Sequence, residues 1–233
     1  WIPGVVQRLL QEHPRLRLDL RVRETPTGED EHTDVELLVA PRDFTPPPGY
    51  HARPLVTEPY VAVVPAEHRL ADRGIIELAE LAEERWIAHD SDLAWCVINL
   101  KRACVAAGFT PNYSVRTADH ITAIAFAAVG IGVTVMPRLC TITVPAGVRT
   151  VEVINPTPWR VVHLMVRRAV EQSPAVRMVV DGLLAKGREA AVQPLAAALT
   201  GAFGRVLMAG PGAGRKTERQ ERKKKPAKTK QTK

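Results

Sequence analysis

Hydrophobic and charged residues alternate in the stretch RLRLDLRVR, residues 15–23. A period of two is typical of a β-strand with one face in water. The next apolar run, VELLVA at 35–40, indicates a buried strand of a parallel sheet. Only residues 25–33 connect the two, although a parallel crossover usually takes a dozen residues or more. The pattern therefore predicts two strands joined by an unusually short connection.

Elsewhere the hydrophobic period changes repeatedly between two and about 3.6, which predicts strands alternating with helices. Helices are expected at 3–13, 75–86, 91–109, 119–129 and 173–190. Strands are expected within 51–65, as two short segments, and at 86–88, 112–117, 132–137, 148–154 and 159–169. The β-α-β-α-β order in the middle of the chain is that of a parallel sheet with helices on its faces.

Small and polar residues mark the ends of these helices. Ser91 or Asp92 suits the N-cap of a helix that Gly108 ends. Gly130 stands where the following helix needs a left-handed C-cap, a conformation that costs little without a β-carbon. Gly132 then opens a strand without a side chain. That glycine fits either tight packing of helix against strand or the wall of a ligand pocket.

Charge is distributed unevenly along the chain. The formal net charge is +7, but residues 215–233 alone carry +8, which leaves −1 for residues 1–214. A nearly neutral body and a disordered basic tail are therefore expected. Such a tail binds DNA or RNA without reading the sequence, or serves only to solubilise the protein. Its cations are Arg215, Lys216, Arg219, Arg222, Lys223, Lys224, Lys225, Lys228, Lys230 and Lys233.

The sequence does not indicate catalytic or cofactor chemistry. It has no nucleophile elbow, no His-x-x-x-His pair and no phosphate-binding glycine loop, so we expect neither an enzyme nor a cofactor. Cys96, Cys104 and Cys140 lack metal-binding spacing and are interpreted as small buried hydrophobes in a reducing cytoplasm. No leader opens the chain, and the uncharged residues 121–137 fit a buried helix and strand better than a membrane span.

Three stretches together resemble the effector-binding domain of LysR-type transcriptional regulators. They are VVPAEHRLA at 63–71, AAGFTPNYSVRT at 106–117 and AVGIGVTVMPR at 128–138, with a helix-then-RWI step between the first two. The resemblance covers about residues 1–187. Nothing in the sequence resembles the winged helix-turn-helix with which the family begins. A truncated regulator is therefore expected.

The resemblance implies a two-lobed α/β fold of the type-2 periplasmic-binding-protein class, each lobe a mainly parallel sheet with flanking helices. Lobe one would comprise residues 1–63 and 160–187, and lobe two residues 64–159. The runs YVAVVP and VVHLMVRR would be two crossover hinge strands. Lobe one would lack its opening strand and be incomplete. Residues 188–214 would form a linker or an amphipathic helix, and 215–233 the basic tail.

The resemblance also carries over a set of effector-binding positions. The first position is the loop after the RWI strand, which would place His89 and Ser91 at the effector. The second is the helix start after VRT, which would place Thr117 and Asp119 there. The backbone near Gly132 would also contact the effector. Helix N-termini at both loops would offer N–H groups to a carboxylate. From the residues alone, a solvated loop explains His89 better than ligand contact does, and capping explains Ser91 and Thr117 at least as well as ligand contact.

The partners implied are a small organic effector, such as a carboxylate, and a second copy of the chain. The function would be effector sensing in the regulation of DNA-templated transcription. DNA would be contacted only through a missing domain or non-specifically through the tail. The homodimer, or a higher homo-oligomer, would bury Val5, Leu9, Val97 and Leu100 between chains. The alternative is a free-standing solute-binding or interaction module without a regulatory role.

Overall fold

The computed structural model describes residues 2–21, 33–89, 92 and 94–201, the last eleven of them by backbone alone. The chain divides into two units, residues 1–194 and 195–233. The predicted basic tail, and the Gly/Pro-rich stretch before it, lie outside the described residues.

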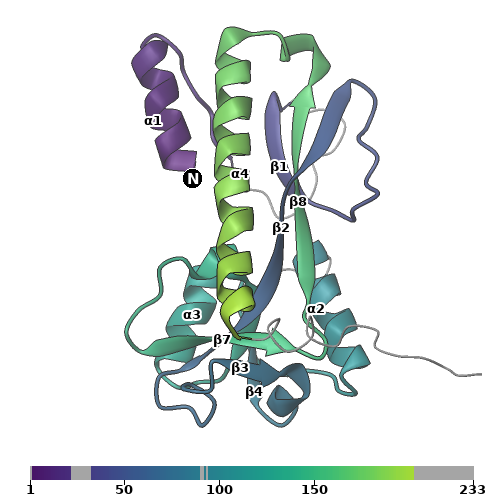
Figure 1. Cartoon of the computed structure of the whole chain (residues 1–233), viewed down its shortest axis with the longest axis vertical. Coiled ribbons are helices and arrows are strands. Elements are labelled where there is room, and N and C mark those ends of the chain that lie inside the picture. The colour runs from purple at the N-terminus through teal and green to yellow at the C-terminus, as the bar shows by residue number, and fades with distance from the viewer. Residues whose placement is uncertain (1, 22–32, 90–91, 93, 202–233) are drawn as a thin grey trace, which may run out of the picture. The chain divides into compact units, whose positions relative to one another are not determined.

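Helices and strands alternate through the first unit (Figure 1). The helices are α1 (Ile2–Glu12), α2 (Trp95–Ala106), α3 (His120–Ala128) and α4 (Pro174–Gly201), with 3-10 turns η1 (Leu78–Leu81), η2 (Arg138–Thr141) and η3 (Arg168–Val170). The strands are β1 (Val35–Val39), β2 (Tyr50–Pro65), β3 (Ile75–Glu77), β4 (Arg85–Ala88), β5 (Asn112–Arg116), β6 (Thr134–Pro137), β7 (Val148–Ile154) and β8 (Trp159–Arg167).

Strand β2 links the two parts of the main sheet. Its first part, residues 50–59, pairs with β8, and its last part, residues 60–65, pairs with β6 and β7. Strand β8 pairs with β1 on its other side, which gives the order β1-β8-β2-β7-β3 with β6 also on β2. The two runs expected to be hinge strands therefore lie in β2 and β8, which run side by side (Figure 1).

Strand direction differs from the expectation of mainly parallel sheets. Among the described ladders, only β3–β7 and β4–β5 are parallel, and the other four are antiparallel. Parallel pairing follows from helical crossovers, and that arrangement holds where α2 joins β4 to β5. Strand β8, by contrast, returns between β1 and β2, and its direction makes both of its ladders antiparallel.

The core forms three clusters of buried side chains. One packs α1 and α4 against the β1–β8–β2 part of the sheet around Leu55, Leu164 and Leu183. A second surrounds Trp86, whose indole Nε1 donates a hydrogen bond to the Leu81 carbonyl at 2.9 Å. The third packs α3 on β6 around Met136. The exact lobe boundaries proposed from the sequence remain a prediction.

Three expectations are not met, and the first is that residues 51–65 form two short segments, since they belong to the single strand β2. Residues 15–21 form no strand, and Leu18 and Leu20 are exposed, because no described strand lies beside them to supply hydrogen bonds. The helix expected at 75–86 is instead β3 followed by η1. There the residues from Ile75 pair with β7 before a helical turn begins. Sheet pairing has overridden a helical periodicity in this short segment.

Glycine caps end both central helices as expected. Gly108 and Gly130 have φ values of +87° and +77°. Ile131 N donates to the Phe126 carbonyl and Gly130 N to the Ala127 carbonyl, the two bonds of a Schellman motif. Helix α2 starts later than expected, with Ala94 rather than Asp92 as its N-cap. Asp92 instead pairs with Lys101 and Arg116.

The side chains expected between two chains of a dimer are already covered within one chain. Val5, Leu9, Val97 and Leu100 are all buried. They pack inward because they occupy the core-facing sides of α1 and α2, so they are not available for an interface. Homodimer formation itself stays a prediction, and it would have to use other residues of these helices.

Candidate functional site

A buried ion pair joins β2 to β8. Arg160 Nε donates to Glu58 Oε1 at 2.7 Å, and the Leu139 backbone N–H of η2 donates to Glu58 Oε2 at 2.6 Å. The Glu58 side chain is 4% exposed and the Arg160 side chain 12%. Burial, the largest single influence, disfavours the charge of Arg160, but Glu58 together with Cys96 and Cys140 outweighs it and keeps the pKa of Arg160 above its usual range. The charges of this pair therefore compensate each other in a water-poor environment.

Two thiols and a phenol surround the same guanidinium. Arg160 lies 3.4 Å from Cys96 Sγ in the first turn of α2 and 3.9 Å from Cys140 Sγ in η2. Tyr60 donates its hydroxyl hydrogen to the Cys96 carbonyl at 2.9 Å. Burial raises the pKa of the Cys140 thiol to about 11, so it is protonated near neutrality. The cluster thus ties β2, β8, α2 and η2 together at one point.

Two histidines stack close to this cluster. The rings of His89, which follows β4, and His120, the first residue of α3, have centroids 4.6 Å apart and planes inclined by 43°. His89 Nδ1 lies 3.2 Å from Thr134 Oγ1 on β6. Both Nε2 atoms are buried, and neither has a hydrogen-bond partner among the described residues. Unpaired buried polar atoms are uncommon and costly, so each requires an explanation.

Both histidines are neutral at physiological pH. Burial, the neighbouring His120 and the Arg160 charge lower the pKa of His89 to about 3. Burial and Arg160 lower the pKa of His120 to about 4, although Asp119 acts in the opposite direction. Two uncharged imidazoles next to a guanidinium are suited to hydrogen-bond a polar, electron-rich group that enters from outside the chain.

The predicted site residues are distributed between this cluster and its edge. His89 lies within it and is 1% exposed, so it is not a solvated loop residue. Asp119 is the N-cap of α3, accepting from Thr122 N at 2.8 Å, and this hydrogen bond holds the pKa of its carboxyl below the usual value. Thr117 is half-buried, and its N–H donates to the Ala88 carbonyl. Ser91 lies outside the described residues.

Gly132 is in tight contact with a neighbouring strand. A β-carbon added there would stand 2.3 Å from the carbonyl oxygen of Arg85 on β4. That oxygen also accepts a hydrogen bond from Val133 N at 2.8 Å. The close approach favours the packing explanation of this glycine over the pocket-wall explanation. Its part in effector binding stays a prediction.

The substitution Gly132→Ala is expected to lower the free energy of unfolding by about 1–3 kcal/mol. The new methyl group would push against the Arg85 carbonyl, so the Val133–Arg85 hydrogen bond has to lengthen or break. Urea unfolding followed by circular dichroism measures the change. Gly4→Ala in α1 is the control, since nothing lies within 4 Å of its added β-carbon. Equal effects of the two substitutions would contradict the packing explanation.

Sequence reasoning missed several members of the cluster, namely Glu58, Tyr60, Cys96, His120, Thr134 and Arg160. A signal was present for two of them: His120 directly follows the capping Asp119, and Glu58 interrupts an apolar strand. No three His, Cys, Asp or Glu side chains of the described residues are grouped so as to hold a metal ion. Within the same residues, no helix is both long and apolar enough to cross a membrane.

The family model of the LysR substrate binding domain matches residues 1–188. The chain belongs to this family. An uncharacterized HTH-type transcriptional regulator, YwbI of Bacillus subtilis (strain 168), is 31% identical over 113 residues, 47% of this chain and 37% of that protein. The HTH-type transcriptional regulator ShiR of Corynebacterium glutamicum (strain R) is 29% identical over 90 residues, 38% and 30% of the two lengths. The chain thus spans about a third of the length of these curated relatives.

Solved structures show the same fold at low identity. The effector binding domain of QuiR in complex with shikimate has a TM-score of 0.64 at 19% identity, covering 81% of this chain and 90% of that one. The C-terminal domain of a probable LysR family transcriptional regulator from Rhodococcus sp. RHA1 has a TM-score of 0.59 at 24% identity, covering 78% of this chain and 90% of that one. The BenM effector binding domain with benzoate has a TM-score of 0.60 at 18% identity, covering 78% of this chain and 83% of that one. The two-lobed, type-2 periplasmic-binding-like fold expected from the sequence is therefore confirmed.

Proposed function

We propose that this LysR substrate-binding domain senses a small organic acid at the His89–His120–Arg160 cluster and so controls transcription. The observation that carries the proposal is the pair of buried Nε2 atoms without a partner. A bound carboxylate accepts hydrogen bonds from two neighbouring imidazoles, which removes the cost of leaving those atoms unpaired. The domain is non-enzymatic in this proposal and works in the cytoplasm.

Three further observations support an anionic ligand. Arg160 contributes a positive charge close to both histidines. Helix α3 begins at His120, so the positive end of its dipole lies at the cluster, and α2 begins at Trp95 without a side-chain cap. Shikimate and benzoate, which occupy the QuiR and BenM domains of the same fold, are both carboxylates. The proposed effector-binding residues are His89, His120 and Thr134, with Thr117, Ser91, Asp119 and Gly132 at the edge.

Calorimetric titration with shikimate, benzoate and a panel of other small organic acids tests the proposal. We expect at least one acid to bind, and we expect its affinity to rise as the pH falls from 7.5 to 6. The bound carboxylate raises the pKa of both imidazoles, so the complex holds more protons than the free protein. His120→Gln is expected to weaken binding about tenfold, because one charge-assisted hydrogen bond is lost.

His13→Gln, at the end of α1, is the matched control and should leave the affinity unchanged. Absence of binding by every acid of the panel to protein that is shown to be folded would count against the proposal. So would an unchanged affinity in His120→Gln. The free-standing solute-binding alternative predicts the same binding, and sequencing the DNA upstream of Trp1 separates the two: an in-frame helix-turn-helix supports the regulator.

Any nucleic-acid affinity of residues 1–233 is proposed to reside in the basic tail and to be non-specific. The supporting observation is the charge division of +8 for 215–233 against −1 for the rest. If about six tail cations contact phosphates, the logarithm of the binding constant falls with the logarithm of the salt concentration with a slope of roughly −5. Titration of the full chain and of a version ending at Gly214 against two unrelated duplexes measures this. Retained affinity in the shortened chain would place DNA binding on the body instead.

A further inference from the structure

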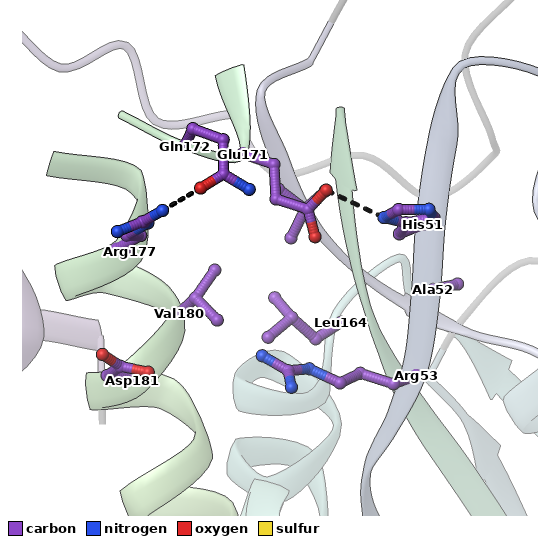
Figure 2. Close-up of a pocket in the computed structure, with 10 residues that line it drawn as sticks. His51, Ala52, Arg53, Leu164, Glu171, Gln172, Arg177, Val180 and Asp181 are labelled. Atoms are coloured by element: carbon purple, nitrogen blue, oxygen red, sulfur yellow. Dashed lines mark hydrogen bonds and ion pairs between the residues drawn. The ribbon is translucent and has the colours of Figure 1, made fainter. Parts of the chain in front are cut away.

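A pocket lined by none of the histidine-cluster residues lies between β2, β8 and the first turns of α4 (Figure 2). Its volume is about 310 Å³, at the lower end of the roughly 300–1,000 Å³ found for small-molecule sites. The lining consists of His51, Ala52, Arg53, Leu164, Val166, Glu171, Gln172, Arg177, Val180 and Asp181. None of these residues belongs to the proposed effector-binding set.

The inner surface of this pocket is apolar. Leu164 and Val166 of β8 are buried, at 0% and 6% exposure, and Val180 of α4 packs against the same core cluster. Figure 2 shows Leu164 and Val180 directed toward the space between the strands and the helix. A hydrophobic ligand body would cover the part-exposed Val180 and the little of Val166 that is still exposed, above the fully buried Leu164.

Most polar groups at the rim already have partners. His51 Nδ1 lies 2.9 Å from Glu171 Oε2, which connects β2 to the turn before α4. Arg177 donates to the Gln172 side-chain oxygen. Asp181 stands one helical turn after Arg177 on the same face of α4, where opposite charges partly compensate each other. With histidine counted as neutral, Glu171, Arg177 and Asp181 leave one formal negative charge along the helix side of the pocket.

Arg53 has no such partner. It projects from β2 across the pocket toward α4 in Figure 2, and the structure shows no hydrogen bond or ion pair from its guanidinium to any described residue. An arginine over an apolar floor offers two parallel N–H donors to a carboxylate while the floor receives the rest of the molecule. With histidine counted as neutral, Arg53 and Arg177 balance Glu171 and Asp181 in formal charge, and Arg53 is the cation on the strand side of the pocket.

We propose that this pocket is a second small-molecule site, which takes a monocarboxylate with a compact apolar body. Arg53 binds the carboxylate, and Leu164, Val166 and Val180 bind the body. The site lies on the same β2–β8 ladder as the Glu58–Arg160 pair, with Arg53 opposite Leu164 and Glu58 opposite Arg160 in register. It is nevertheless built from different residues, so each site can be removed without altering the other.

Methyl-group NMR of the full chain with benzoate as the probe tests this site. We expect benzoate to shift the methyl signals of Leu164, Val166 and Val180 in a saturable manner. Benzamide, the neutral isostere, should bind about tenfold more weakly, and Arg53→Gln should weaken benzoate by about the same factor. Arg42→Gln, an exposed arginine in the loop after β1, is the matched control and should change nothing.

Three results would overturn the proposal: equal binding of benzamide and benzoate, an unchanged affinity in Arg53→Gln, or no shift of these methyl signals at about 20 mM benzoate. Benzoate bound at the histidine cluster is recognised separately, because His120→Gln weakens that binding about tenfold and leaves the Leu164, Val166 and Val180 shifts intact. Failure of one site is thereby distinguished from failure of the other.

Discussion

Replacing Glu58 by glutamine is expected to lower the free energy of unfolding by about 3–5 kcal/mol, because it removes one partner of a buried ion pair. The Arg160 charge would remain in a poorly solvated position with only a neutral amide beside it. The Leu139 N–H would also lose its charged acceptor. Urea unfolding followed by circular dichroism gives the change, with the slope of the transition checked for two-state behaviour.

The double variant Glu58→Gln/Arg160→Met distinguishes an unpaired charge from a simple loss of contacts. It should recover much of the stability lost in Glu58→Gln, because no buried charge is then left without a partner. Asp34→Asn is the matched control at an exposed pair: Asp34 accepts from Arg167 Nε at 3.0 Å and is about half exposed, so a cost of at most about 1 kcal/mol is expected. Similar costs for Glu58→Gln and Asp34→Asn would refute the argument.

Local features of the fold followed directly from the sequence. The ends of α2 and α3 at Gly108 and Gly130 need only a left-handed residue, and the N-cap of α3 needs only Asp119. These interactions span a few residues, so a single sequence determines them. The confirmed family resemblance then supplied the two-lobed topology, which local patterns do not contain.

Strand pairing was beyond local reasoning, and residues 15–21 illustrate why. Their alternating pattern shows that one face would be apolar if a strand formed, but a strand also needs a neighbour for its N–H and C=O groups. The described residues provide none, and Leu20 is consequently 67% exposed. In β3 the reverse occurred: three residues beginning at Ile75 found a partner in β7 and left their helical pattern.

The candidate site was predicted only in part. The family resemblance supplied His89 and Asp119, whereas Glu58 and Arg160 lie far apart in the sequence and meet only because β2 and β8 pair. Charged residues are usually solvated, so the sequence did not show that these two are buried as a pair, although Glu58 interrupts an apolar strand. The stacking of His120 on His89 likewise depends on how α3 packs against β4.

The free protein is expected to lose stability steeply as the pH falls below about 6.5, and the histidine pair is the cause. The pKa of each imidazole is lowered in the folded state, to about 3 for His89 and about 4 for His120. The unfolded chain therefore binds protons that the folded chain does not. At pH 5 this amounts to roughly 2 kcal/mol for each histidine, and the loss continues until the folded pKa values are reached.

Unfolding by urea at pH 7.5, 6, 5 and 4.5 measures the dependence. The variant His89→Gln/His120→Gln should be less stable than the wild type at pH 7.5 but lose far less between pH 6.5 and 4.5, because neither glutamine takes up a proton. His13→Gln should keep the wild-type slope. A double variant with the same slope as the wild type would show that other groups cause the acid sensitivity. A bound carboxylate should reduce the dependence of the wild-type free energy of unfolding on pH. It raises the pKa of both imidazoles toward the unfolded value and stabilises the protonated pair.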